Sequence, residues 1–205
     1  MKKLFFLPVL IAAVALGTAC DKAQDTKTPV TETSAASQSA PESKVEAKVT
    51  LVKYSDYQCP ACKYFHNIEV ELKKAYGDDL DIVTKHFPLS MHAYAQVASR
   101  SVEAARKQGK YDEMHEMMFT GQEQWSRGNA ETIFIGYAQS IGMNVEQFRR
   151  DMNSADMNRI VMADRREGRD LGVGSTPTFF INGDLIEKNP PNVEQFKALV
   201  DKYMD

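Results

Sequence analysis

Two cysteines separated by two residues, Cys59 and Cys62, constrain the fold of this chain more than any other feature of its sequence. They follow residues 49–55, which alternate and are rich in β-forming side chains, a pattern typical of a strand. Residues 60–76 have a helical period, and residues 81–87 favour a second strand. One face of the predicted helix carries Phe65, Ile68, Leu72 and Ala75. The pattern predicts a βαβ unit with the cysteines at its first strand-to-helix turn.

The rest of the sequence predicts a helical block followed by a short hairpin and a last helix. Residues 90–171 favour helices almost throughout, over 93–108, 111–120, 130–141, 145–152 and 155–171, with glycines at several of the breaks. They are followed by a strand over 178–181, a turn at Asn182 and Gly183, a short strand to about residue 187, and a helix over 193–203. The predicted element order is β-α-β, a helical block, and β-β-α.

The spacing of Cys59 and Cys62 can be interpreted in three ways, which differ in their physical demands. At a helix start the two residues lie about 300° apart round the axis and about 4.5 Å apart along it, close enough to form a disulfide. As a structural crosslink, so short a loop would restrict the unfolded chain by only about 2 kcal/mol, against about 5 kcal/mol for about 100 residues. A zinc site needs four ligands, and the sequence has no second Cys-x-x-Cys and no suitably spaced histidine pair. The sequence therefore favours a redox-active dithiol that needs neither a metal nor another cofactor.

The two cysteines are predicted to have unequal roles. Cys59 stands at the helix start, where free N–H groups and the helix dipole stabilise a thiolate, so it is the expected nucleophile. Pro60 suits the first helical position because its missing N–H would have no partner there. Cys62, inside the first turn, is the expected resolving thiol, and exchange would proceed through a mixed disulfide on Cys59.

The start of the chain predicts export. Lys2 and Lys3 precede an apolar stretch over residues 4–16, and small residues follow at 17–19. The stretch is shorter than the ~20 residues that span a bilayer, which argues against an uncleaved anchor. We therefore expect residues 1–19 to be a signal peptide that is cut after Ala19.

The predicted cut would leave Cys20 as the first residue, and the segment resembles the lipobox of bacterial lipoproteins. Gly17 departs from that pattern, which usually has leucine there, and the same site also suits ordinary signal peptidase. If Cys20 carries a lipid, Asp21 resembles a signal for retention in the inner membrane, so the expected location is periplasmic and membrane-anchored. Residues 20–48 are rich in small, polar and proline residues and predict a disordered linker.

The remaining residues, 49–205, suffice for one domain of ordinary size. They carry 19 basic and 23 acidic residues, so this domain has no basic field for nucleic acid. We therefore do not expect a nucleic-acid partner.

Three segments carry a family resemblance. They are residues 54–62 (Tyr-Ser-Asp-Tyr-Gln-Cys-Pro-Ala-Cys), 86–89 (His-Phe-Pro-Leu) and 172–183 (Gly-Val-Gly-Ser-Thr-Pro-Thr-Phe-Phe-Ile-Asn-Gly). Together they resemble DsbA-like thioredoxin-fold proteins over about residues 49–205. The resemblance implies an α/β thioredoxin fold with a helical domain inserted between the second strand and the cis-proline loop. It also implies that Pro177 is cis and lies against the cysteines, and that Thr176 contacts substrate by strand-like backbone pairing.

Some positions near the cysteines depart from the family or have no assigned role in it. Ala61 stands where DsbA itself has a histidine that helps to stabilise the thiolate. Lys53 stands where the family usually has an acidic proton acceptor, and two interpretations remain open: a surface lysine at a strand edge, or a cation that favours the thiolate. Tyr57 and Gln58 are predicted to contact substrate at the rim of the site, whereas His66 is expected at the surface.

The resemblance implies a monomeric thiol–disulfide oxidoreductase acting on exported proteins. We expect it to donate a Cys59–Cys62 disulfide and to be reoxidised by a DsbB-like membrane quinone reductase. The alternative within this class is a reductase or isomerase, because Thr176 before the proline resembles the DsbC and DsbG isomerases. Those are dimers built on an N-terminal domain that residues 21–48 cannot form. A non-catalytic chaperone or surface-binding lipoprotein is the alternative of another class, and the intact cysteine motif argues against it.

Overall fold

The computed structural model describes residues 46–204. The predicted signal peptide, Cys20 and most of the predicted linker therefore lie outside the described residues. The elements in chain order are β1 (Val49–Ser55), α1 (Pro60–Tyr76), the 3-10 turn η1 (Gly77–Asp79), β2 (Leu80–His86), α2 (Ala95–Arg106), α3 (Tyr111–Thr120), α4 (Gln122–Trp125), α5 (Ala130–Ser140), α6 (Val145–Met152), α7 (Ala155–Asp170), β3 (Thr178–Ile181), β4 (Asp184–Leu185) and α8 (Val193–Asp201). Over residues 46–204, none of the helices combines the length and the apolar character needed to cross a membrane.

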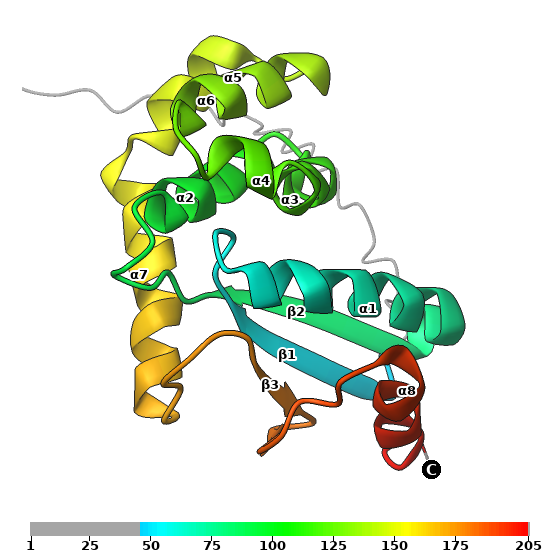
Figure 1. Ribbon diagram of the computed structural model, residues 1–205. Helices are drawn as coiled ribbons and strands as arrows, with labels where there is room; N and C mark the ends of the chain where they lie inside the picture. Colours follow the sequence, from blue (N-terminus) through cyan, green and yellow to red (C-terminus); the bar gives the residue numbers. More distant parts are fainter. Residues whose placement is uncertain (1–45, 205) are drawn as a thin grey trace, which may run out of the picture. The chain divides into compact units, whose positions relative to one another are not determined.

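The four strands form one mixed sheet in the order β2-β1-β3-β4. Figure 1 labels β2, β1 and β3 of this sheet. β1 pairs in parallel with β2 and antiparallel with β3, and β3 pairs antiparallel with β4. Leu51 thus lies between Ile82 and Ile181. The seven residues of β1 span about 20 Å, so Val49 and the turn after Ser55 lie at opposite ends of this inner strand.

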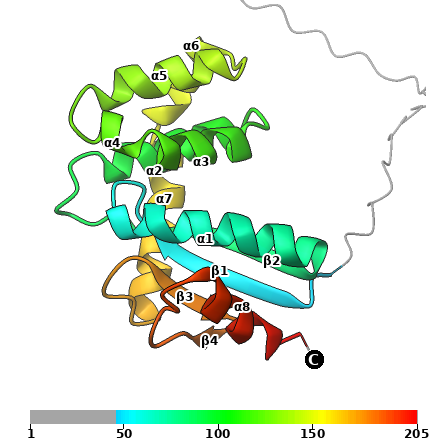
Figure 2. The same ribbon diagram turned by 45° about the vertical axis from the view of Figure 1, so that its right-hand side comes forward.

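Helices cover both faces of the sheet (Figure 2). On one face, α1 and α8 pack against β1, β2 and β3 through the buried side chains Val49, Leu51, Ile68, Leu72, Leu80, Phe179, Ile181, Phe196 and Val200. The neighbouring residues of β1 point to the other face, where Tyr54 packs with Phe87, Val173 and Phe180 beside α7. This alternation along β1 places a packed helix layer on each side of the strand that leads to the cysteines.

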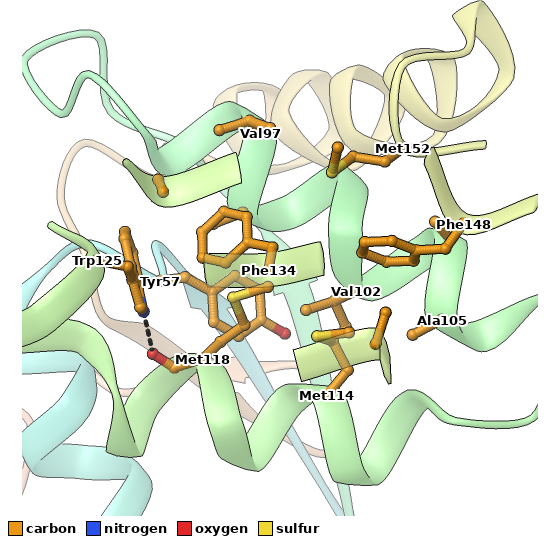
Figure 3. Packing of buried hydrophobic residues seen from close by; sticks show 14 of the residues in the cluster. Tyr57, Val97, Val102, Ala105, Met114, Met118, Trp125, Phe134, Phe148 and Met152 are labelled. Carbon is orange, nitrogen blue, oxygen red and sulfur yellow. Dashed lines mark hydrogen bonds between the residues drawn. The ribbon is translucent and has the colours of Figure 1, made fainter. Parts of the chain in front are cut away.

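Helices α2 to α7 are inserted between β2 and β3, as the sequence predicted, and they enclose a second core (Figure 3). This core includes Tyr57, Val97, Val102, Ala105, Met114, Met118, Trp125, Phe134, Phe148 and Met152. The indole N–H of Trp125 donates to the carbonyl oxygen of Met118 at 2.8 Å, so the buried polar group of the ring is satisfied. Because Tyr57 belongs to this core, the insertion packs directly on the turn that carries the cysteines.

Most predicted element bounds are confirmed to within about two residues, and the bounds of α1 agree fully. The predicted face of α1 is wrong at Ala75, which is exposed. Instead, α1 buries a second row of side chains, which includes His66 and Glu69. This row is polar because it faces charged and aromatic partners, Lys53, Glu116 and Phe119, and not the apolar core beneath the sheet.

We predict that Gly168→Ala destabilises the protein. A Cβ atom on Gly168 of α7 would lie 2.8 Å from Cδ1 of Tyr54 and 2.9 Å from Cδ2 of Phe87. Overpacking of this kind costs about 1–3 kcal/mol, more than the ~1 kcal/mol by which alanine favours a helix over glycine. Urea unfolding should therefore show a lower free energy of unfolding. Gly136→Ala in α5 is the matched control, since nothing lies within 4 Å of its added Cβ and it should stabilise. Equal gains in both variants would contradict the prediction.

Candidate active site

The paired cysteines lie where the sequence predicted, at the start of α1. Cys59 is the N-cap residue, with φ −76° and ψ 121°, and Pro60 follows at the first helical position. Cys62 lies in the first turn, and both cysteines are free thiols. Cys59 is 7% exposed and Cys62 is fully buried, so only the first sulfur is near the surface.

The groups around the two thiols shift their pKa values in opposite directions. A hydrogen bond from the Cys62 thiol lowers the pKa of Cys59 most, and the Thr176 side chain and the N–H groups of Cys62 and Ala61 lower it further. Burial opposes them, and the resulting pKa of Cys59 is about 5. The pKa of Cys62 is raised well above its ordinary value, first by burial and then by its contact with Cys59. This arrangement suits an anionic Cys59 beside a protonated Cys62.

The loop before β3 brings a second segment against Cys59. The Thr176–Pro177 peptide is cis, as the resemblance implied. The Cys59 thiol lies 3.5 Å from the carbonyl oxygen of Thr176, to which it donates, and Asn189 Nδ2 donates to the carbonyl oxygen of Pro177 at 2.9 Å. A groove of about 230 Å³ runs along this loop, lined by Gly174, Ser175, Pro177, Thr178, Leu185 and Asn189 among others.

Asp56, a residue that the sequence analysis did not single out, ties down the turn before Cys59. Its carboxylate is fully buried and accepts from the backbone N–H of Gln58 at 2.7 Å, from the N–H of Leu89 at 2.8 Å and from His92 Nδ1 at 2.8 Å. Its own N–H donates to Cys62 Sγ at 3.5 Å. These contacts fix the turn to the loop that follows β2. In the sequence, only the position of this aspartate just before the cysteine motif points to its role.

Gln58 lies at the rim of the site, whereas Tyr57 does not. Gln58 is half-buried, and its side-chain oxygen accepts from the N–H of Tyr94 at 2.7 Å. It also borders an open groove of about 380 Å³, which is lined as well by Pro60, Lys63, Tyr64, Asn67, Gln122, Glu123, Ser126 and Arg127.

The prediction that Tyr57 lies at the rim is wrong. Its side chain is fully buried in the core of the helical insertion. Its hydroxyl lies 2.7 Å from His115 Nδ1, and its ring packs on Phe119 with 4.9 Å between centroids. The turn directs successive side chains to opposite sides, so Tyr57 points inward where Gln58 points outward.

Of the two interpretations left open for Lys53, the surface lysine is wrong. Lys53 is fully buried on the α1 side of β1, with Nζ 2.5 Å from Glu69 Oε2 and 5.0 Å from the centre of the Phe119 ring. His66 is buried as well, and its Nε2 lies 2.8 Å from Glu116. Position 53 of β1 thus carries a lysine in place of the family's usual acidic residue, and the carboxylate beside it comes from Glu69 of α1.

No group of three or more His, Cys, Asp or Glu side chains over residues 46–204 is arranged to hold an ion.

Comparison with known proteins gives a consistent fold. The family profile described as "Thioredoxin" matches residues 44–202. A thioredoxin-like oxidoreductase from Silicibacter pomeroyi superimposes with a TM-score of 0.65 at 28% identity, covering 77% of this chain and 87% of that one. BdbD from Bacillus subtilis gives a TM-score of 0.69 at 21% identity, over 78% of this chain and 89% of that one. Alpha-DsbA1 from Wolbachia pipientis gives 0.68 at 20% identity, over 78% and 87%.

Curated relatives are much longer than this chain. Na(+)/H(+) antiporter NhaA 1 of Mycobacterium sp. (strain KMS) is 36% identical over 143 residues, which are 67% of this chain but 22% of the antiporter. The similarly named protein of Salinispora arenicola is 36% identical over 158 residues, 76% of this chain and 23% of its own length. This chain thus spans under a quarter of the length of these relatives.

Proposed function

The chain belongs to the thioredoxin family, as a DsbA-like member with the Cys-x-x-Cys motif of that fold. We propose that it is a thiol–disulfide oxidoreductase that donates a Cys59–Cys62 disulfide to exported proteins. One observation carries the proposal. Cys59 begins α1 with its pKa lowered to about 5, while burial raises the pKa of Cys62 beneath it. An acidic thiol is a good leaving group, and release of Cys59 completes the transfer of a disulfide to substrate.

The proposed reaction has two exchange steps. A substrate thiolate attacks Sγ of Cys59 in the oxidised pair, so the Cys59–Cys62 bond breaks as a bond between substrate and Cys59 forms. Cys62 leaves as a thiolate and takes up a proton, because its pKa is raised well above the ordinary value. A second substrate thiolate then attacks the substrate sulfur of the mixed disulfide and releases Cys59 as a thiolate. Two electrons pass from the substrate dithiol to the pair.

The residues around the pair are proposed to hold the substrate. Thr176 supports this role because it follows the exposed residues Gly174 and Ser175 and its carbonyl oxygen faces Cys59 at 3.5 Å. We propose that an extended substrate segment pairs with the backbone there, as a strand would. Pro177, Pro60 and Ala61 would shape the contact surface, and Gln58 would border it.

The place of the reaction and the source of its oxidant are further parts of the proposal. Export of the chain would put Cys59 in the periplasm, where disulfides persist. The reduced pair would be reoxidised by a DsbB-like membrane quinone reductase, which accepts the two electrons. The domain would act as a monomer, in contrast to dimeric isomerases.

The reduction potential of the Cys59–Cys62 pair tests the direction of transfer. A pKa near 5 at Cys59, against about 7 in thioredoxin, stabilises the dithiol about fiftyfold at pH 7, which corresponds to about 50 mV. We expect a potential of about −220 mV or higher, where thioredoxin has about −270 mV. The exported protein is equilibrated with glutathione buffers and its free thiols are counted. A potential at or below about −270 mV would reject the oxidant and favour a reductase.

The same measurement over a range of pH checks the physical cause. A lowered pKa at Cys59 stabilises the dithiol form fully above the ordinary pKa of about 8.5, and this stabilisation is lost as the pH falls through about 5. Above pH 5, reduction takes up one proton, on Cys62, and the potential should fall by about 30 mV per pH unit. Below pH 5 it takes up two, and the slope should double. One slope throughout would show that Cys59 has no lowered pKa.

Lipidation at Cys20 is proposed from the sequence alone, since this residue lies outside the described part of the chain. Cys20→Ser should release the protein from membranes and leave disulfide exchange unchanged, because the redox pair is Cys59 and Cys62. Membrane fractionation and mass spectrometry of the mature N-terminus measure this. Recovery of wild-type protein that starts at an unmodified Cys20 would remove the lipid anchor from the proposal and leave export intact.

A further inference from the structure

A buried glutamine of the helical insertion holds the backbone of the active-site turn. Gln122 is the first residue of α4 and is 4% exposed. Its side-chain Nε2 donates to the carbonyl oxygen of Tyr57 at 2.6 Å and to that of Cys59 at 3.0 Å. An amide group has two N–H donors, so one side chain satisfies both carbonyls.

These two hydrogen bonds fix the peptide planes on either side of the one that joins Gln58 to Cys59. The Tyr57 carbonyl belongs to the plane before it, and the Cys59 carbonyl to the plane that leads into Pro60. The plane between them is held by the Cys59 N–H, which donates to the carbonyl oxygen of Asp56 at 3.1 Å. The Cys59 carbonyl also accepts from the N–H of Lys63 at 3.2 Å, the first hydrogen bond of α1. Gln122 therefore connects the insertion to the start of the catalytic helix.

The orientation of those planes determines where Cys59 Sγ points. The groups that lower the pKa of Cys59 include the Cys62 thiol, the Thr176 side chain and the N–H groups of the first helical turn. The effect of each group depends steeply on its distance and angle to Sγ, so a turn that tilts by a few tenths of an ångström weakens several of them together. A buried carbonyl that loses its donor is also expensive, which drives the turn to move once the amide is removed.

We propose that Gln122 is a positioning residue for Cys59, through which the helical insertion fixes the backbone that directs the Cys59 side chain. The inference deepens the proposed function and rests on Cys59 being the exchanging thiol. Gln122 does not touch the reacting sulfur. It acts through the two carbonyls, and its effect should therefore appear in the thiol's acidity and not only in stability.

The test compares Gln122→Met with Gln124→Met in the full exported chain. Methionine has nearly the length of glutamine but no N–H donor, and Gln124 is an exposed residue of the same short helix. We expect Gln122→Met to raise the pKa of Cys59 by about one unit, measured by thiolate absorbance against pH. A tenfold loss of thiolate stabilisation corresponds to a reduction potential lower by about 30 mV. Gln124→Met should leave both quantities unchanged.

The possible outcomes are distinct. If Gln122→Met lowers the melting temperature but leaves the pKa of Cys59 unchanged, or if both variants shift it equally, the positioning role is overturned. If Gln122→Met does not fold, NMR of the unaltered protein decides: the side-chain amide signals of Gln122 should move when the pair is oxidised and those of Gln124 should not. Unmoved Gln122 signals would also overturn the role. Failure of the oxidant proposal shows separately, as a low potential in the unaltered protein.

Discussion

Cys59→Ser should abolish disulfide transfer, whereas Cys62→Ser should accumulate a mixed disulfide with substrate. Serine at position 59 cannot form a bond to sulfur, so the exchange has no first step. Serine at position 62 leaves Cys59 able to exchange with a disulfide, but removes the thiol that would resolve the complex. The Cys62→Ser complex should be visible as a band of higher mass on non-reducing gels after incubation with an oxidised substrate protein.

The same two variants separate the acidities of the thiols. In Cys62→Ser, alkylation of Cys59 should follow a titration near pH 5, because the serine hydroxyl and the remaining donors still stabilise the thiolate. In Cys59→Ser, Cys62 should remain unreactive to pH 8 and beyond, because burial raises its pKa. Cys20→Ser, in which both active-site thiols remain, is the control. A faster and more acidic Cys62 would reverse the assigned roles, and two ordinary thiols would argue against catalysis altogether.

Lys53→Met should lower the free energy of unfolding by about 3–5 kcal/mol, a larger effect than we expect from any surface change. Lys53 is fully buried and its Nζ lies 2.5 Å from Glu69 Oε2, while the other carboxylate oxygen of Glu69 has no hydrogen-bond partner among the described residues. Removing the lysine leaves an uncompensated carboxylate in the interior, where it is poorly solvated. Urea unfolding of the reduced protein gives the measurement.

A double variant distinguishes loss of the pair from loss of packing. Lys53→Met with Glu69→Leu removes both charges, so it should cost much less than the sum of the single variants. Lys63→Met is the matched control: it breaks the pair with the exposed residue Glu123 at 3.1 Å and should cost under about 1 kcal/mol. If Lys53→Met costs no more than Lys63→Met, the buried ion pair contributes nothing of note to the fold.

The sequence predicted those elements whose hydrophobic period matched their packing. β1, α1 and β3 were located to the residue, because each buries an apolar row against the sheet or its helices. The helical insertion was likewise predicted from continuous helical periods between glycines. The four-residue helix α4 was not, since one turn is too short to show a period.

The burial of polar side chains could not be predicted from a hydrophobic period. Lys53 and Glu69 are 16 residues apart, and neither position suggests an interior site until β1 and α1 are packed together. Asp56 and His92 are joined only because the loop after β2 returns to the active-site turn. Gln122 lies 63 residues from Cys59, and its role depends on the insertion folding back over that turn. Such contacts follow from tertiary packing, which no local pattern records.

The direction of β1 has a consequence for how a tethered enzyme could work. Residues before Val49 join the domain at one end of this strand, and Cys59 is carried beyond the other end, about 20 Å away. An anchor attached through the N-terminal segment would therefore join the domain at the end of β1 that is distant from Cys59. The thiol would then lie on the side of the domain away from the attachment, where polypeptides approach from the aqueous phase. A longer linker would let the domain reach further along the membrane surface.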